Sequence, residues 1–380
     1  MAETRASGIP AFTPVNLITG FLGSGKTTLL KRMLASPALA DTAVLINEFG
    51  EIGLDHELIE RIDDTIVLLQ SGCLCCSIRG ELAQSIRGLD ERRASGTIAP
   101  YRRLIIESTG LADPLPILTT ITADPVLRHH YRFGLVITTV DAVNGMAQLD
   151  RQPESRKQAA VADRLVVTKT DLASAADVEI LVTRLRRINP SAAIIRAVDE
   201  IFNPEDLIGG DLFDVASKTR EVRRWFEDET NALEPSAPNH YPPAHRHHGR
   251  QQAHQHDPNR HGDDIGAFHL IFDRPIDWTA FGLWLSLMLH RHGETILRVK
   301  GLLAIQGEPA PVAVHGVQQL VHPPIHLEAW PSQDRRTRIV IIGKGLDEMA
   351  FRRSFDAFVL APKLRTEETA SIAPTPASRE

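Results

Sequence analysis

Hydrophobic residues between positions 12 and 230 fall into short apolar runs separated by longer amphipathic stretches. The runs are rich in Val, Ile and Leu and do not alternate with polar residues, which is typical of parallel strands buried on both faces. They predict strands at 15–19, 42–47, 65–69, 103–107, 133–141 and 164–169. The stretches between them predict helices at 26–35, 79–92, 155–162 and 175–188. This alternation predicts a doubly wound α/β domain with a mostly parallel sheet.

The pattern changes after residue 230. Residues 231–264 are rich in Pro, His, Gln and Asn and contain almost no large aliphatic side chains, so they predict a flexible linker. The chain then resumes an α+β pattern with strands at 266–273, 295–305, 311–315, 324–330 and 337–342 and helices at 278–290 and 346–359. We therefore expect a large domain at 1–230, a His-rich linker at 231–264, a smaller domain at 265–365 and a disordered tail at 366–380.

The segment GFLGSGKTT, residues 20–28, lies between the first predicted strand and the first predicted helix. It matches the phosphate-binding loop G-x-x-x-x-G-K-[ST] in the structural context that this motif requires. Its backbone N–H groups and the helix N-terminus would surround phosphate, Lys26 would reach the β- and γ-phosphates, and Thr27 would ligate Mg²⁺. The predicted nucleotide contacts are Gly23, Ser24, Gly25, Lys26, Thr27 and Thr28.

A second motif, Thr168-Lys169-Thr170-Asp171, follows the strand predicted at 164–169. Many GTPases read guanine with Asn-Lys-x-Asp at such a strand end, and here Thr168 replaces the Asn. The carboxylate of Asp171 would accept two hydrogen bonds that guanine can donate and adenine cannot. The alternative is that Asp171 only caps the next helix.

Acidic residues follow two other strands. Glu107 ends the strand at 103–107, where it would hold Mg²⁺, and Gly110 lies three residues later, where its N–H would face the γ-phosphate. Glu48 lies in NEFGEIGLD, residues 47–55, which has the character of a switch loop near that phosphate. We expect Lys26, Glu107 and Glu48 to serve hydrolysis. The alternatives are an acidic cap and a plain acidic loop.

The chain has three cysteines, Cys73, Cys75 and Cys76, and an odd clustered set is not a disulfide framework. Three thiolates this close favour an exchangeable site for zinc or cobalt over a closed structural site, although buried inert thiols remain an alternative. Seven of the sixteen histidines lie within residues 240–261, and they include His245, His247 and His248. These three are candidates for weak metal capture or are solvated linker residues.

Composition narrows the function classes. The net charge of −6 argues against nucleic acid as a partner. No apolar run reaches the roughly 18 residues that span a bilayer, and the first ten residues carry no secretory signal, so no membrane partner is expected. We expect a soluble cytoplasmic protein.

Five segments in this order, GFLGSGKTTLL, NEFGEIGLD, CLCC, IIESTGLADP and TKTD, resemble the CobW-type metallochaperone GTPases. The resemblance implies a SIMIBI-class P-loop G domain followed by a CobW-type C-terminal domain. It also implies slow hydrolysis of GTP with Mg²⁺, and zinc or cobalt bound by Cys73, Cys75 and Cys76. GTP would order the loops at 47–55 and 72–79 and raise metal affinity, and hydrolysis would release the metal to a client protein.

Two alternatives stay open: a zinc-buffering or storage protein with nucleotide-regulated binding, and a P-loop kinase of a small molecule. The intact Lys26, Thr27 and Glu107 favour the GTPase over storage, and the Cys cluster and TKTD motif count against the kinase. The sequence does not name the metal or the client, and it leaves the oligomeric state open.

Overall fold

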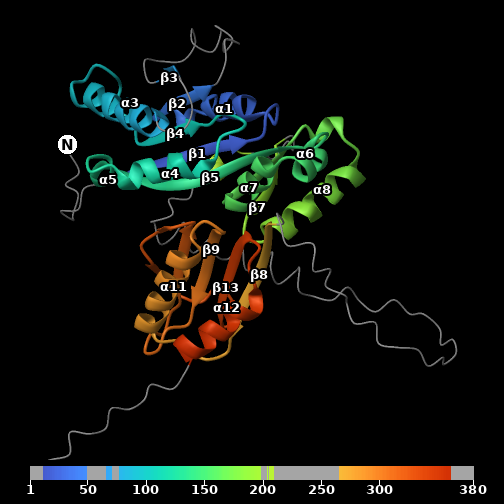
Figure 1. Ribbon diagram of the computed structural model, residues 1–380. Coiled ribbons are helices and arrows are strands. Elements are labelled where there is room, and N and C mark those ends of the chain that lie inside the picture. Colours follow the sequence, from blue (N-terminus) through green and yellow to red (C-terminus); the bar gives the residue numbers. More distant parts are fainter. Residues whose placement is uncertain are drawn as a thin grey trace, which may run out of the picture.

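The computed structural model describes residues 12–48, 66–70, 77–197, 203, 205–208 and 265–360. Its N-terminal domain is built on a seven-stranded sheet with the order β3-β2-β4-β1-β5-β6-β7 (Figure 1). Every neighbouring pair is parallel. The strands are β1 (Thr13–Gly20), β2 (Thr42–Glu48), β3 (Ile66–Gln70), β4 (Arg103–Glu107), β5 (Tyr131–Asp141), β6 (Arg164–Thr168) and β7 (Ala193–Arg196).

Helices cover both faces of this sheet, because successive strand residues point to opposite sides. Leu17 joins one hydrophobic core and Ile18 joins the other. The first core takes in α3 (Ser77–Ala94), α4 (Pro114–Ala123), α5 (Leu127–His130), α6 (Gly145–Arg151), α7 (Pro153–Val161) and α8 (Ala175–Ile188). The second takes in α1 (Lys26–Leu34), the 3₁₀ turn η1 (Pro37–Leu39) and α9 (Glu205–Ile208). The doubly wound prediction is confirmed.

The C-terminal domain is an antiparallel sheet with helices on one face, and its six strands follow the order β11-β10-β9-β13-β8, with β12 paired to β10. Its helices cover a core that includes Trp284, Phe281 and Phe355. Its elements are β8 (Ile265–Phe272), α11 (Trp278–His292), β9 (Ile296–Leu303), β10 (Val312–Val317), β11 (Leu320–Val321), β12 (Ile325–His326), β13 (Thr337–Lys344), α12 (Glu348–Phe355) and the π-helical turn η3 (Asp356–Leu360). The strand predicted at 324–330 is therefore shorter than expected.

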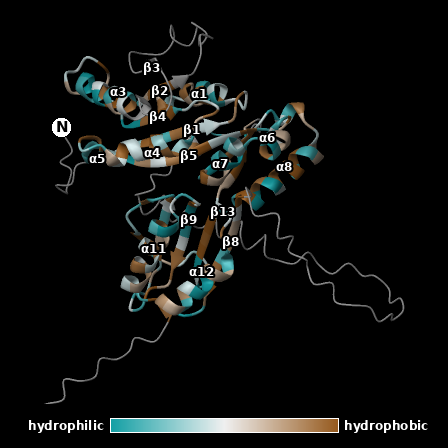
Figure 2. Ribbon diagram, in the orientation of Figure 1, coloured by the Kyte–Doolittle hydropathy of each residue, from teal (hydrophilic) through white to brown (hydrophobic). Residues whose placement is uncertain are grey.

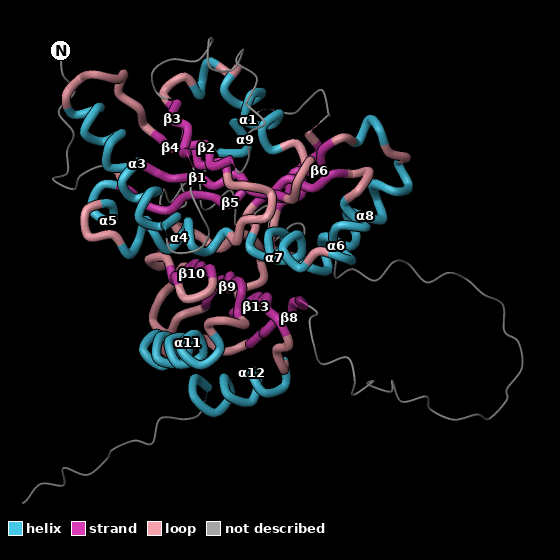
Figure 3. The backbone as a smooth tube through the Cα atoms, turned by 45° about the horizontal axis from the view of Figure 1, so that its top comes forward, coloured by secondary structure: helices cyan, strands magenta, loops and turns pink. Residues whose placement is uncertain are grey.

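The opposite face of the C-terminal sheet packs on the N-terminal domain. Leu297, Leu302 and Val340 of that sheet belong to the same hydrophobic core as Ala160 of α7 and Leu185 of α8. Hydrophobic residues concentrate in the strands of both sheets, and the helices carry mixed colours (Figure 2). The turned view places β9 close to α7 (Figure 3), and α7 contacts both β9 and β8. The two domains thus share one core.

The linker expected at 231–264 and the tail expected at 366–380 lie outside the described residues. In the part of the chain that the structure does describe, no helix has the length and apolar character needed to cross a bilayer.

Candidate nucleotide site

The phosphate-binding loop connects β1 to α1 at the carboxyl edge of the parallel sheet. Gly25 caps α1 with φ 88° and ψ 23°, a left-handed conformation that favours glycine. Gly20 must also be glycine, because a Cβ there would lie 2.3 Å from Thr139 Oγ1. The N-terminus of α1 presents backbone N–H groups and a positive dipole end, and no acidic residue in its first turn offsets this charge. Lys26 Nζ donates to Gly20 O at 3.0 Å and Phe21 O at 3.3 Å, which holds the ammonium inside the loop.

The oxygen donors expected to serve Mg²⁺ meet beside this loop. Thr27 Oγ1 donates to Glu107 Oε1 at 2.6 Å, although the two residues are 80 positions apart. Glu107 reaches this position because β4 pairs with β1, with Ile18 opposite Glu107. A hydroxyl and a buried carboxylate are hard oxygen ligands of the kind that Mg²⁺ prefers, so the donor set fits this ion.

The loop after β4 lies against the phosphate-binding loop. A Cβ on Gly110 would lie 2.6 Å from the backbone N of Leu22, so the two backbones approach as closely as glycine allows. From the other side, Gln158 Nε2 on α7 donates to Gly110 O and Ala112 O, each at 3.1 Å. Gly110, whose N–H was predicted to face the γ-phosphate, is therefore held beside the phosphate-binding loop.

The TKTD segment is tied to the same loop. Thr168, which replaces the Asn of the common motif, donates from Oγ1 to Ser24 O at 2.8 Å. Lys169 has φ 56°, a rare conformation for a residue other than glycine, and its Nζ donates to Gly23 O at 2.7 Å. Asp171 is exposed in the turn η2 (Thr170–Leu172) on this edge. The next helix, α8, is capped by Ser174 instead, so the capping interpretation of Asp171 is wrong.

Asp141, at the end of β5, is a residue that sequence reasoning missed. Its carboxylate is almost fully buried and accepts hydrogen bonds from Lys169 Nζ at 2.8 Å, Asn144 Nδ2 at 3.0 Å and Val143 N at 2.8 Å. Burial raises the pKa of Asp141, but the bonds from Lys169, Asn144 and Val143 outweigh burial and hold the pKa below its usual 3.8. The ionised Asp141 thus fixes Lys169 in its left-handed position. The signal available in the sequence was an acidic residue ending an apolar strand.

The structure brings most of the predicted nucleotide residues to one edge. Ser24, Lys26, Thr27, Glu107, Gly110, Thr168 and Lys169 all lie there. Glu48 ends β2, but its side chain lies outside what the structure describes. The predicted metal ligands Cys73, Cys75, Cys76, His245, His247 and His248 also lie outside the described residues. Within the described ranges, no group of three or more His, Cys, Asp or Glu side chains is placed to hold a metal ion.

Comparison with known families identifies this combination of domains. Residues 14–196 match the CobW/HypB/UreG nucleotide-binding domain, and residues 265–359 match the cobalamin synthesis protein cobW C-terminal domain. The chain belongs to the CobW/HypB/UreG family. The resemblance drawn from the five sequence motifs is confirmed.

Two zinc chaperones match the chain over most of its length. Zinc chaperone YjiA of Escherichia coli is 33% identical over 90% of this chain and 97% of that protein. Zinc chaperone CobW of Pseudomonas aeruginosa is 30% identical over 92% of this chain and 93% of that protein. The crystal structure of Zn(II)-bound YjiA GTPase from E. coli matches with a TM-score of 0.61 and 29% identity, and covers 91% of this chain and 99% of that one.

Proposed function

We propose that this protein is a GTP-hydrolysing metal chaperone that carries zinc to a client protein. The observation that carries the GTPase assignment is the link between the TKTD segment and the phosphate-binding loop, through Thr168 to Ser24 and Lys169 to Gly23. This link supports a guanine-reading role for Asp171, which follows Lys169 by two residues. Family membership supports the same activity, since the E. coli relative is a GTPase.

The arrangement suits transfer of the γ-phosphoryl group of GTP to water. Water attacks the γ-phosphorus, the bond to the oxygen that bridges to the β-phosphate breaks, and GDP and inorganic phosphate leave. Lys26 lies inside the loop, where its charge would stabilise the phosphate oxygens as negative charge moves onto them. Thr27 and Glu107 would hold Mg²⁺, which supplies further positive charge at the β- and γ-phosphates. We assign Glu48, at the end of β2, to orientation of the attacking water.

Zinc as the cargo is supported by the names of the relatives, which are zinc chaperones in E. coli and P. aeruginosa. We assign Cys73, Cys75 and Cys76 as its ligands; cobalt would fit the same thiolates. The motif begins three residues after β3 ends at Gln70 on the carboxyl edge of the sheet, and Cys76 directly precedes α3. Thiolates are favoured at a helix N-terminus. Free thiols also agree with a reducing cytosol as the compartment.

The test is phosphate release from GTP and from ATP, measured for the wild type and for Asp171→Asn. We expect the wild type to prefer GTP, because Asp171 accepts from both guanine donors, and we expect the variant to lose at least about tenfold of this preference. Asp150→Asn, another exposed carboxylate on the neighbouring helix α6, is the matched control and should keep the preference. Equal use of GTP and ATP by the wild type would refute the assignment.

A further inference from the structure

Helix α7 lies between the loop after β4 and the C-terminal sheet and is bonded to both. On the loop side, Gln158 Nε2 donates to Gly110 O and Ala112 O at 3.1 Å. The preceding residue, Lys157, pairs with Asp113 at 2.6 Å. Gly110, Ala112 and Asp113 lie three to six residues after Glu107. Helix α7 therefore holds the loop that follows the candidate Mg²⁺ ligand and carries the predicted γ-phosphate contact.

Gln158 is built into this position. Its side chain is fully buried, and its backbone O accepts from Thr138 Oγ1 at 2.9 Å on β5. Two carbonyl partners require the amide nitrogen as donor, so the orientation of the amide is fixed. The amide oxygen, Oε1, is buried without a hydrogen-bond partner among the residues that the structure describes. A buried acceptor of this kind can take an N–H from the loop if the loop adopts a second arrangement, for example when Gly110 turns toward a γ-phosphate.

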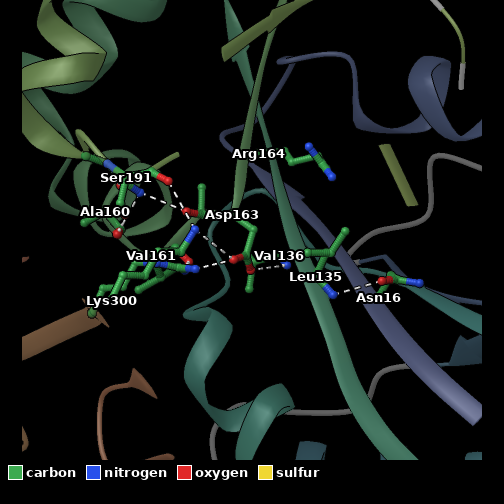
Figure 4. Close-up of polar contacts among 12 residues, drawn as sticks. Asn16, Leu135, Val136, Ala160, Val161, Asp163, Arg164, Ser191 and Lys300 are labelled. Atoms are coloured by element: carbon green, nitrogen blue, oxygen red, sulfur yellow. Dashed lines mark hydrogen bonds and ion pairs between the residues drawn. The ribbon is translucent and has the colours of Figure 1, made fainter. Parts of the chain in front are cut away.

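The C-terminal domain forms hydrogen bonds with the C-terminal end of α7. Arg298 on β9 donates to Val161 O, the last residue of α7, and to the carboxylate of Asp163. Lys300, also on β9, lies 3.5 Å from Asp163 Oδ1 and donates to Ser191 O at 3.1 Å. Arg298, Lys300 and Asp163 are all at least 95% buried. Figure 4 shows Lys300 reaching from the C-terminal domain toward Asp163 and Ser191.

Other carbonyls at the C-terminal end of α7 and just beyond it also accept hydrogen bonds, which fixes the position of this end. Asn189 Nδ2 donates to the carbonyls of Ala159, Ala160 and Ala162 at 3.0, 3.0 and 2.9 Å. Asn189 Oδ1 in turn accepts from Ser191 N and Oγ, and Ser191 O is the acceptor of Lys300. A displacement of the C-terminal sheet must therefore displace α7, and Gln158 lies only three residues, or about one helical turn, from Val161.

We propose that Gln158 is a positioning residue for GTP hydrolysis. We also propose that α7 couples the loop after β4, which contains Gly110, to the C-terminal domain through Arg298. The inference rests on the proposed GTPase activity. A partner that displaces the C-terminal domain would change the hydrolysis rate through this helix. By reciprocity, nucleotide would change the affinity of the C-terminal domain for that partner by the same factor.

The first test uses Gln158→Met in the full-length protein, because Met keeps the length of the side chain and fits a buried site but donates no hydrogen bond. We expect kcat for GTP to fall about tenfold or more because the loop loses its position, while the Kd of a non-hydrolysable GTP analogue changes less than about twofold. Gln148→Met, on the half-buried face of α6, is the matched control and should keep the wild-type kcat.

The second test uses Arg298→Lys, which keeps a positive charge for Asp163 but cannot reach Val161 O and the carboxylate together. We expect a lower kcat with unchanged analogue affinity. The double variant with Gln158→Met should be no slower than the slower single variant, because both changes act on one path. If Gln158→Met does not fold, Lys157→Gln, which removes only the partly exposed pair with Asp113, supplies the same comparison.

A Gln158→Met protein with the wild-type unfolding midpoint and the wild-type kcat overturns the positioning role. A normal kcat for Arg298→Lys, or effects that multiply in the double variant, overturns the coupling. A wild type that binds GTP but releases no phosphate overturns the proposed function itself, and this inference with it. The failures are therefore distinguishable.

Discussion

Replacing Arg298 by Met tests whether the two domains form one cooperative unit. Arg298 is 2% exposed, and its guanidinium joins β9 to Val161 and Asp163 across the domain boundary. Removing one partner of a buried ion pair costs about 3–5 kcal/mol, because the other charge stays buried. Asp163 keeps Val136 N at 3.0 Å and Lys300 at 3.5 Å, so we expect the low end of the range, about 3 kcal/mol.

The assay is urea denaturation of the full-length protein followed by fluorescence and circular dichroism. Because Leu297 and Val340 share a core with α7 and α8, the wild type should unfold in a single transition with both probes. Arg291→Met, an exposed arginine on α11, is the control and should change the free energy of unfolding by less than about 0.5 kcal/mol. Combining Arg298→Met with Asp163→Asn should not recover the loss, because Asp163→Asn leaves the buried Lys300 without its carboxylate partner. A loss below about 1 kcal/mol, or separate unfolding of the two domains in the wild type, would refute this reasoning.

Three further predictions concern the site and the linker. Lys26→Ala should lower kcat for GTP about 100-fold or more, because its charge serves the phosphates. The unfolding midpoint should stay close to that of the wild type, because Nζ donates to the loop carbonyls of Gly20 and Phe21 and joins no hydrophobic core. A near-normal kcat in a folded variant would contradict the role of the loop. Because the pKa of Asp141 is lowered in the folded protein, its contribution to stability is present above pH 3.8 and is lost as the pH falls through the folded-state pKa. The difference in free energy of unfolding between the wild type and Asp141→Asn should therefore be constant from about pH 5 to 8 and shrink below pH 3.8. A difference that grows in acid would contradict this role of Asp141. Deleting residues 240–261 should leave GTP hydrolysis nearly unchanged. It should lower the number of weakly bound Zn²⁺ ions at about pH 7.5 but not at about pH 5.5, because only neutral imidazole binds metal. Unchanged zinc stoichiometry at about pH 7.5 would assign the histidines to a solvated linker.

Elements with a strong local signal could be predicted from the sequence. Strands 103–107 and 164–168 have apolar centres, Leu-Ile-Ile and Leu-Val-Val, that are buried on both faces, and helix 175–188 carries a clear helical period. β7 was missed because its four residues are half-buried at the sheet edge. α4 was missed because Pro114 and Pro116 interrupt its pattern, although proline is well tolerated in the first turn of a helix.

The phosphate-binding loop could also be predicted, because its chemistry depends on contiguous residues. Contacts between distant residues could not. Gln158 and Gly110 are 48 positions apart, and Arg298 and Asp163 are 135 apart, so no spacing in the sequence marks either pair. The side chains involved have no local signature: a glutamine within a helix and an arginine within an apolar strand both read as ordinary surface positions until the fold buries them.

The most direct test of a nucleotide-gated metal site is a Co²⁺ titration that follows thiolate-to-cobalt absorbance in two states of the full-length protein. One sample contains a non-hydrolysable GTP analogue with Mg²⁺, and the other contains GDP with Mg²⁺. We predict that the metal binds about 5–150-fold more tightly in the GTP-analogue state, the usual range of allosteric coupling. Replacing Cys75 and Cys76 by Ser should abolish both the absorbance and the difference, because a hydroxyl is a poor ligand for a soft metal site. Equal affinity in the two states would contradict a GTP-driven chaperone and would favour a protein that only buffers zinc.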